Sequence, residues 1–258
     1  MPDPCHLRSE LFASHGLHGI VSLRTGGESN APFDSMNLAD NTGDDPAIVE
    51  RNLRTLLAES GIALEPHRAR QIHGCGVLHC RAAGRMHDSE ADILLSVDGS
   101  PVAVRVADCT PVLLADPYSG LVAAVHAGWR GTEANVVGHA VRAMLDAGAQ
   151  TGNMLASIGP CIGPCCFEIG EDTAAELRNC CPDAADFVLQ KQGRPHADLT
   201  GINRLQLLQA GLALANIEVM LAAPAGCTCC NSRDYFSFRR DGAMSGRHLA
   251  IVAPMASA

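Results

Sequence analysis

Two consecutive segments constrain the architecture most strongly: VAVRVADCTPVLLAD at residues 102–116 and LVAAVHAGWRG at residues 121–131. The apolar runs at 102–106, 112–115 and 121–125 predict three strands, with a turn at 117–120 between the second and the third. Short apolar runs of this kind are consistent with fully buried strands. Polar residues interrupt or follow the runs, at 107–111 and at 126–131, and they are the first sign of a site.

Further elements follow from caps and periodicity. Asp45 and Pro46 predict a helix start, and Gly61 predicts its end. We expect a second helix from about Thr132 to Gly148 and another capped by Thr200. Additional predicted elements are strands at 154–158, 217–221 and 249–252 and a helix from Asp172 onward.

The order of these elements predicts a mixed α/β fold. The strands and helices do not alternate as in a regular βαβ repeat, so we expect a mixed sheet or two sheets with helices outside. No linker, repeat or low-complexity tract interrupts the 258 residues. We therefore predict one domain over residues 1–258.

Composition excludes several classes of protein. Hydrophobic residues make up 47% of the chain, which argues against disorder. The net charge of -9 argues against nucleic-acid or membrane-surface binding, because an acidic surface repels phosphate groups. No apolar stretch approaches the roughly 20 residues that span a bilayer, and no secretory signal is visible. We expect a cytoplasmic protein.

The twelve cysteines are therefore expected to be reduced, with several simply buried. Two cysteine-rich segments suggest a second metal site: Cys161, Cys165 and Cys166, and Cys227, Cys229 and Cys230. Neither appears as paired C-x2-C, since residues 227–230 read C-x-C-C. Adjacent cysteines on a strand would point to opposite faces. The sequence therefore favours ordinary buried thiols here.

A more promising metal site combines His73, Cys109 and His126, which lie on different loops near strand ends. A catalytic zinc usually has three protein ligands and one open position, and it prefers thiolate and imidazole. Because the chain has so many histidines and cysteines, spacing alone favours a buried thiol and hydrogen-bonded histidines over a metal site. The segment HAGWRG at 126–131 indicates an anion-binding turn before a helix, or else a packed Trp129 with Arg130 in a surface ion pair.

Five ordered motifs resemble the YfiH-like family, long labelled multicopper polyphenol oxidase or laccase-domain and now regarded as purine nucleoside phosphorylase. The resemblance extends from about Gly19 to Val252. The motifs are QIHG (71–74), ADCTPVLLAD (107–116), HAGWRG (126–131), IGPCIGPCCFEIG (158–170) and CNSRDYFSFRRDG (230–242) followed by GR (246–247).

This resemblance implies a single α/β/β/α layered domain with a zinc site at His73, Cys109 and His126; copper is the less favoured metal. It also implies phosphorolysis of adenosine, guanosine, inosine and methylthioadenosine, with deamination of adenosine as a second activity. The partners would be purine nucleosides and phosphate, and we expect a monomer or weak homodimer. Val106 stands where the family usually has Thr before ADC, which removes a hydroxyl near the site.

Several residues are candidates for the chemistry. Arg130 would hold phosphate, with Arg24 as a second holder. Asp108 would orient a ligand or move a proton, and Asn37 and Gln71 would bind ribose or base. A metal with an open position would activate water for deamination at C6 of the purine.

Three other functions compete. A copper-dependent polyphenol oxidase fits the older family label, but no H-x-H pair for a trinuclear copper centre occurs in the sequence. A structural zinc site in an interaction module would close its coordination with a fourth ligand. A cysteine hydrolase would use Cys109 as nucleophile and His126 as base, and it would not need metal.

Overall fold

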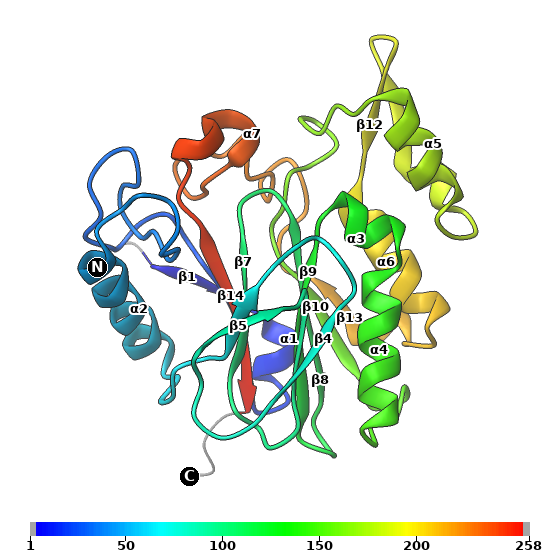
Figure 1. Cartoon of the computed structure of the whole chain (residues 1–258). Coiled ribbons are helices and arrows are strands. Elements are labelled where there is room, and N and C mark those ends of the chain that lie inside the picture. Colours follow the sequence, from blue (N-terminus) through cyan, green and yellow to red (C-terminus); the bar gives the residue numbers. More distant parts are fainter. Residues whose placement is uncertain (1–3, 255–258) are drawn as a thin grey trace.

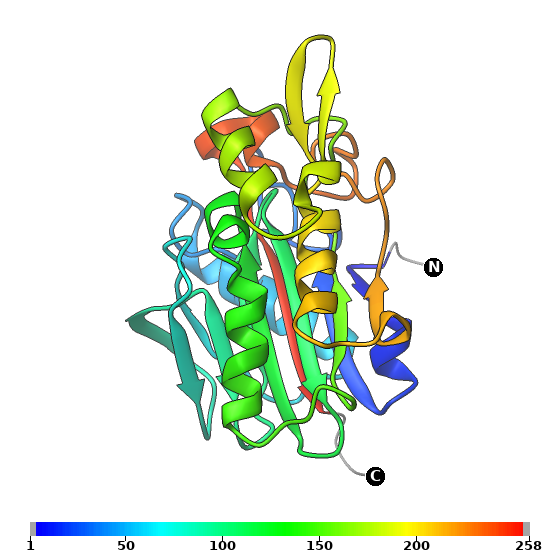
Figure 2. The ribbon, with the colours of Figure 1, turned by 90° about the vertical axis from the view of Figure 1, so that its right-hand side faces the viewer.

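The computed structural model describes residues 4–254, and two stacked β-sheets form its centre. Helix α2 (Pro46–Ser60) covers the outer face of the smaller sheet, whereas α4 (Val136–Asp146) and α6 (Leu199–Gln209) cover the larger one (Figure 1). The turned view shows α4 and α6 side by side over the larger sheet (Figure 2). The layer order is α/β/β/α, and the predicted mixed α/β fold is confirmed.

The smaller sheet is antiparallel and joins distant parts of the chain. In spatial order its strands are β1 (His6–Arg8), β2 (Leu17–Ser22), β14 (His248–Pro254) and β7 (Val102–Val106). Because β14 lies between β2 and β7, N-terminal and C-terminal segments both contribute to this sheet.

The larger sheet is mixed. In spatial order the strands are β13 (Ile217–Val219), β10 (Leu155–Ile158), β8 (Thr110–Asp116), β9 (Leu121–Ala127), β6 (Ile93–Ser96) and β4 (Val77–Cys80). β13 runs parallel to β10 and β4 parallel to β6, while the other pairs are antiparallel. Every residue of β8 and β9 is buried, which explains the apolar runs at 112–115 and 121–125.

Side-chain alternation along these strands builds three cores. Val112 and Leu114 of β8 pack with the α4 side of the sheet, whereas Leu113 lies between the two sheets. In the smaller sheet, Val104 faces the larger sheet and Ala103 faces α2. Burying one such Leu contributes about 1.5–3 kcal/mol, so a register shift of one residue would be strongly destabilising.

Short elements complete the described chain. None of its helices is long and apolar enough to cross a bilayer. The remaining elements are α1 (Glu10–Ala13), α3 (Trp129–Glu133), α5 (Glu171–Asn179), α7 (Phe238–Asp241), and the strand pairs β3 (Arg68–Arg70) with β5 (Met86–Glu90) and β11 (Val188–Lys191) with β12 (Arg194–Ala197).

The caps of α2 are confirmed, but two other helix starts were predicted wrongly. Asp45 accepts a hydrogen bond from Ala47 N, and Gly61 ends α2 at φ 73°. Thr132 belongs to α3 instead, and α4 begins after Asn135, whose φ of 57° breaks the helix and whose side chain accepts from Gly138 N. Similarly, Asp198 and not Thr200 caps α6. In both cases a neighbouring Asn or Asp is the stronger N-cap.

Candidate metal centre and pocket

A pocket of about 400 Å³ opens between the β7–β8 turn, the end of β9 and α7. These segments lie at the same end of the two sheets (Figure 1). The volume of the pocket is within the usual range for small-molecule sites. The lining residues are Asn41, Arg70, Gln71, His73, Arg105, Ala107, Asp108, Cys109, His126, Ile162, Phe167, Phe238, Arg239 and Arg247.

The three predicted metal ligands meet in this pocket. Cys109 lies in the β7–β8 turn, His126 lies near the end of β9, and His73 lies in the loop after β3. Their ligand atoms all lie within 4.8 Å of one another, and Cys109 Sγ is 3.8 Å from His73 Nε2. In a tetrahedral zinc site a sulfur and a nitrogen ligand would be about 3.5 Å apart, so the donor set fits zinc.

Asp92, which immediately precedes β6, orients two of these ligands. One of its oxygens accepts a hydrogen bond from His126 Nδ1 at 2.7 Å, and the pair is almost fully buried. Its carboxylate also accepts from the backbone N–H groups of Ile72, His73 and Gly74. Because Nδ1 of His126 is occupied, its Nε2 is the nitrogen left for a metal.

The charges of this group reinforce one another. Burial opposes ionisation of Cys109, but the charge of His126 and hydrogen bonds from both histidines lower its pKa to about 6. Burial also opposes protonation of His126, yet Cys109 and Asp92 raise its pKa to about 9. Burial raises the pKa of Asp92, but hydrogen bonds from His126 and from the backbone of Gly74 lower it below its ordinary value. Without metal, the arrangement therefore favours a thiolate beside an imidazolium.

The HAGWRG turn needs a glycine directly behind the ligands. A Cβ on Gly128 would lie 2.7 Å from His73 Cδ2 and 3.1 Å from Cys109 Sγ. Both separations are shorter than ordinary van der Waals contact. Gly128 therefore lets the chain leave β9 and start α3 while the ligands remain close.

Asp92→Asn is expected to weaken zinc binding about 10- to 100-fold and to lower the melting temperature. An amide replaces one acceptor oxygen with a donor, which would face an N–H group already pointing at it. Competition with a zinc chelator and thermal unfolding measure the two effects. Asp88→Asn, an exposed change on β5, is the matched control. Unchanged zinc affinity in Asp92→Asn would contradict the orienting role.

Four arginines give this acidic protein a locally positive pocket. Arg105 is largely buried and Arg247 is partly buried, whereas Arg70 and Arg239 are exposed. Burial lowers the pKa of both Arg105 and Arg247, and the charge of Arg105 contributes to lowering that of Arg247. An anion bound between two guanidinium groups would offset this repulsion.

Gln71, a predicted substrate residue, lines the pocket and also supports Arg105. Its side-chain oxygen accepts from Arg105 N at 2.8 Å, and its amide donates to Arg105 O at 2.7 Å. Asp40 pairs with the Arg105 guanidinium at 2.7 Å. The backbone and head group of Arg105 are therefore both held in place.

Asp108 lines the pocket, but its carboxylate is already engaged. It accepts hydrogen bonds of 2.6 Å from Thr228 Oγ1 and from Arg239 N. Its φ of 86° is in the left-handed region. This geometry connects the metal-ligand turn to residues 228–239 of the C-terminal segment.

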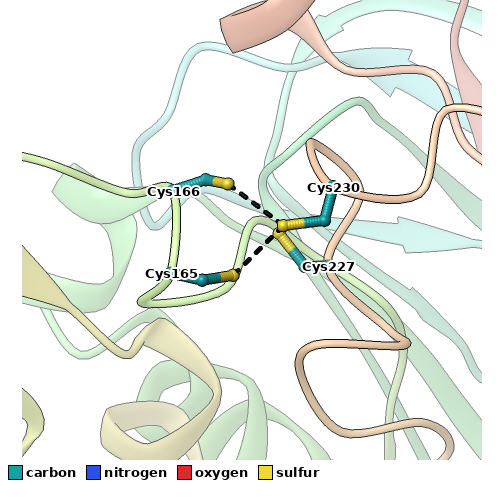
Figure 3. A group of neighbouring side chains, drawn as sticks. All are labelled: Cys165, Cys166, Cys227 and Cys230. Atoms are coloured by element: carbon teal, nitrogen blue, oxygen red, sulfur yellow. Dashed lines mark hydrogen bonds between the residues drawn. The ribbon is translucent and has the colours of Figure 1, made fainter.

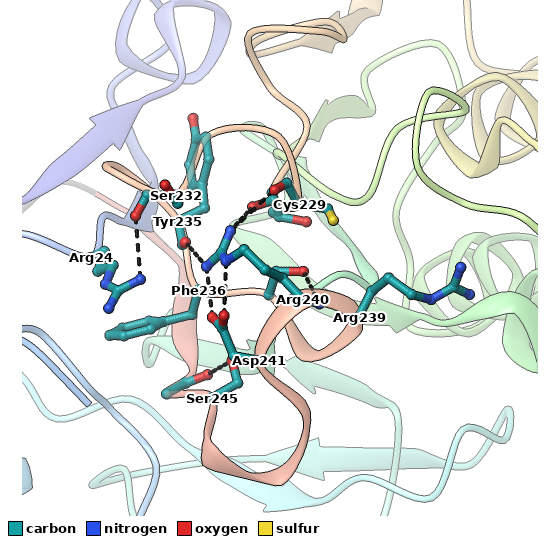
Figure 4. A network of polar contacts seen from close by, with 12 residues as sticks. Arg24, Cys229, Ser232, Tyr235, Phe236, Arg239, Arg240, Asp241 and Ser245 are labelled. Carbon is teal, nitrogen blue, oxygen red and sulfur yellow. Dashed lines mark hydrogen bonds and ion pairs between the residues drawn. The ribbon is translucent and has the colours of Figure 1, made fainter. Parts of the chain in front are cut away.

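Arg240 holds that C-terminal segment together. Its guanidinium donates to the carbonyls of Thr228, Cys229 and Tyr235 and pairs with Asp241 (Figure 4). Several charge-assisted bonds on one planar group restrain a loop better than a single bond does. The neighbouring Arg239 is thereby presented to the pocket.

Three predicted substrate residues are not among those lining the pocket. Arg130 is exposed and stacks on the ring of Trp129, with 4.3 Å to the ring centroid. Arg24 donates to Ser232 O (Figure 4). It also pairs with Asp34, and these residues line a separate surface depression.

The third is Asn37. It is fully buried, and its amide bonds Ala39 O, Thr42 and Asp44 while its oxygen accepts from Arg247 N. It therefore supports Arg247 from behind. Val106 is also buried and pairs with His248 in the smaller sheet.

Sequence reasoning missed Asp92, Arg105 and Arg247. Asp92 could have been noticed in the sequence as an acidic residue directly before the apolar run at 93–95. Arg105 could have been noticed as a charged residue inside an otherwise apolar strand. Arg247 lies in the GR that ends the C-terminal motif, yet nothing in its spacing placed it near residue 109.

Fold and site together define a two-sheet α/β protein whose substrate-sized pocket contains a candidate metal centre of two histidines and one cysteine. The chain belongs to the family described as multi-copper polyphenol oxidoreductase laccase, whose model matches residues 18–254. The purine nucleoside phosphorylase of Deinococcus radiodurans is 36% identical over 233 residues, covering 90% of this chain and 87% of that protein. Adenosine deaminase RL5, from an unknown prokaryotic organism, is 32% identical and covers 90% and 92%.

Solved structures agree with this assignment. The crystal structure of YlmD from Geobacillus stearothermophilus superposes with a TM-score of 0.86 at 30% identity, covering 98% of this chain and 97% of YlmD. Relatives named YfiH are also present among the similar proteins. The predicted resemblance to the YfiH-like family is thus confirmed.

Proposed function

We propose that the chain is a zinc-dependent purine nucleoside phosphorylase with adenosine deaminase as a second activity. The observation that carries the proposal is the meeting of His73, Cys109 and His126 with Arg105 and Arg247 in one pocket. Its substrates would be adenosine, guanosine, inosine and methylthioadenosine. The names of relatives over 30% identical along most of the chain, phosphorylase and adenosine deaminase, support this assignment.

In phosphorolysis, a phosphate oxygen attacks C1′ of the ribose as the bond to the purine breaks. The base leaves with the electron pair and is protonated, giving free base and ribose-1-phosphate. Arg105 and Arg247 would hold phosphate, since both are partly buried and near the candidate ligands. They replace Arg130 and Arg24 in this role, because those residues do not line the pocket.

The apolar part of the pocket suits a purine. Phe167, Phe238 and Ile162 line it, and Arg247 lies 5.5 Å from the ring centroid of Phe238. An aromatic base would stack on such surfaces and exclude water from the ribose bond. Gln71 has donor capacity left for ribose or base after its bonds to Arg105. Asp108 would position Thr228 and Arg239.

The protein residues prepare the metal site. His73, Cys109 and His126 would hold zinc, and Asp92 keeps His126 in the tautomer that binds metal. Bound zinc would supply Lewis acidity toward a substrate or water oxygen. The pocket side chains would orient the nucleoside against this group and fix the position of phosphate.

The family description also names copper oxidation, which makes copper-dependent oxidation of polyphenols the second candidate. A multicopper centre needs clusters rich in histidine pairs. Among residues 4–254, the side chains that could hold a metal form three groups, and none contains more than two histidines. This ligand set favours the nucleoside reactions.

Product identification tests the proposal. Metal-replete protein is incubated with adenosine, with and without phosphate, and the products are separated. Adenine and ribose-1-phosphate should form when phosphate is present, and inosine should form with or without phosphate. Oxygen uptake with a phenol in place of adenosine would support the oxidase. If adenosine is not converted with or without phosphate, the proposed function fails.

A further inference from the structure

Four cysteine side chains outside the pocket converge from two distant loops. Cys165 and Cys166 lie in the turn after β10, and Cys227 and Cys230 lie in the loop after β13. Their sulfurs all lie within 4.8 Å of one another, with Cys230 Sγ at 3.5 Å from Cys165 and 3.2 Å from Cys166 (Figure 3). All four are free cysteines. We propose that they bind one zinc ion in a second metal site.

This corrects the expectation that adjacent cysteines would point apart. That argument assumed a strand, but residues 164–166 form a turn, and both side chains point toward Cys230 (Figure 3). The second loop also contains a C-x2-C spacing, formed by Cys227 and Cys230 with Thr228 and Cys229 between them. This is the ligand spacing of many zinc sites.

The geometry fits a tetrahedral metal better than a disulfide. With zinc–sulfur bonds of about 2.3 Å, the sulfurs of a site made by four cysteines lie about 3.8 Å apart. Cys230 Sγ lies somewhat closer than that to Cys165 (3.5 Å) and Cys166 (3.2 Å), and all four sulfurs lie within 4.8 Å of one another, whereas a disulfide needs about 2.05 Å. A set of four cysteines is also chemically selective, because soft thiolates prefer zinc over hard cations such as magnesium.

The surroundings would stabilise the negative charge of four thiolates. Gly163 N donates to Cys227 Sγ at 3.2 Å. Three cations bond carbonyls of the same loops: Lys191 bonds Pro164 O, Arg239 bonds Cys166 O, and Arg240 bonds Cys229 O. A zinc ion with four thiolates carries two net negative charges, so these cations offset it.

Without a metal the four thiols do not all ionise. Burial, together with the thiols of Cys227 and Cys230, raises the pKa of Cys165 to about 12, and burial with Cys230 also raises that of Cys166. Burial acts in the same direction on Cys227, but the backbone N–H groups of Gly163 and Cys230 lower its pKa below the ordinary value. Close thiolates repel one another, so they do not ionise together in the absence of a cation. Zinc would displace the thiol protons and bind the four sulfurs, as metal sites of this class do.

Such a zinc ion would fasten one wall of the pocket. Phe167 follows Cys166 directly and lines the pocket, and Thr228 follows Cys227 and bonds Asp108. The guanidinium of Arg239 lies 5.3 Å from the ring centroid of Phe167. Cys166 and Cys230, whose sulfurs lie 3.2 Å apart, are 64 residues apart in sequence, and a shared ion would hold their two loops together.

Zinc content provides the test. The full chain is purified under reducing, chelator-free conditions, and zinc per chain is measured in wild type, C165S/C230S and C180S/C181S. We expect C165S/C230S to contain about one zinc fewer than wild type. C180S/C181S removes another adjacent, half-buried pair and should match wild type. Comparison with wild type makes the result independent of zinc at His73, Cys109 and His126.

Alkylation of the wild-type protein gives a second measurement that needs no variant. Cys165 and Cys230 are exposed, so as free thiols they would be accessible to iodoacetamide, which is added at alkaline pH because only the thiolate reacts. We expect these two residues to be protected in the purified protein and to be labelled after a strong chelator is added. Equal zinc in all three proteins, prompt labelling without chelator, a disulfide within the cluster, or iron with sulfide in place of zinc would each overturn the proposal.

Discussion

His73→Ala should abolish zinc binding at the pocket and reduce both nucleoside activities on the order of 10³-fold or more, because several kcal/mol of electrostatic stabilisation would be lost. The imidazole lies 3.8 Å from Cys109 Sγ and is one of three donors. Removing it leaves two protein ligands, too few for a catalytic zinc site. Steady-state kinetics with adenosine, with and without phosphate, and zinc analysis of the same samples measure the effect.

This variant also separates the metal mechanism from a cysteine nucleophile. Cys109 and His126 remain in His73→Ala, so a hydrolase that uses this pair would keep most of its activity. His79→Ala, an exposed histidine on β4, is the matched control and should behave as wild type. Retained activity in His73→Ala, or full activity of wild type after metal removal, would contradict zinc dependence.

Arg247→Ala should lower phosphate-dependent kcat/KM about 10²- to 10³-fold, with a raised KM for phosphate. The side chain is partly buried, and burial together with the charge of Arg105 lowers its pKa. The charges of Asp108 and Cys109 lie close enough to act in the opposite direction. Deamination does not use phosphate and should fall less than about 10-fold. Initial rates at varied phosphate, with inosine formation measured in parallel, distinguish the two.

Two comparisons locate the phosphate site. Arg130→Ala removes the arginine at the HAGWRG turn, which stacks on Trp129 outside the pocket lining. Arg142→Ala removes an exposed arginine on α4 and controls for the loss of one positive charge. We expect both to resemble wild type. If Arg130→Ala lost phosphate-dependent activity and Arg247→Ala retained it, phosphate would bind at the turn as the motif first indicated.

Local sequence predicted the central strands and the α2 caps well. The runs at 102–106 and 121–125 are apolar because both faces of their strands are covered, and that pattern is local. Helix starts near Thr132 and Thr200 were predicted less well. In each case Asn135 or Asp198 offered a competing cap within a few residues, and only the backbone conformation identifies the one used.

The roles of polar residues were harder to predict because they depend on partners far along the chain. Arg130 looked like an anion binder beside a helix start, but its side chain turns onto Trp129. Asn37 looked available to substrate, but it is buried behind Arg247, 210 residues away in sequence. The local sequence around a residue does not indicate which distant residue it will contact.

Residue types and their order along the chain were enough to indicate a mixed α/β fold, and the five family motifs singled out His73, Cys109 and His126 as candidate ligands. Folding then determined what surrounds them. Asp92 joins two ligand loops, Arg105 and Arg247 come together from distant segments, and four cysteines meet from two loops. Strand periodicity is a property of neighbouring residues, whereas a site is a set of distances, and those distances are set by how the sheets and loops pack.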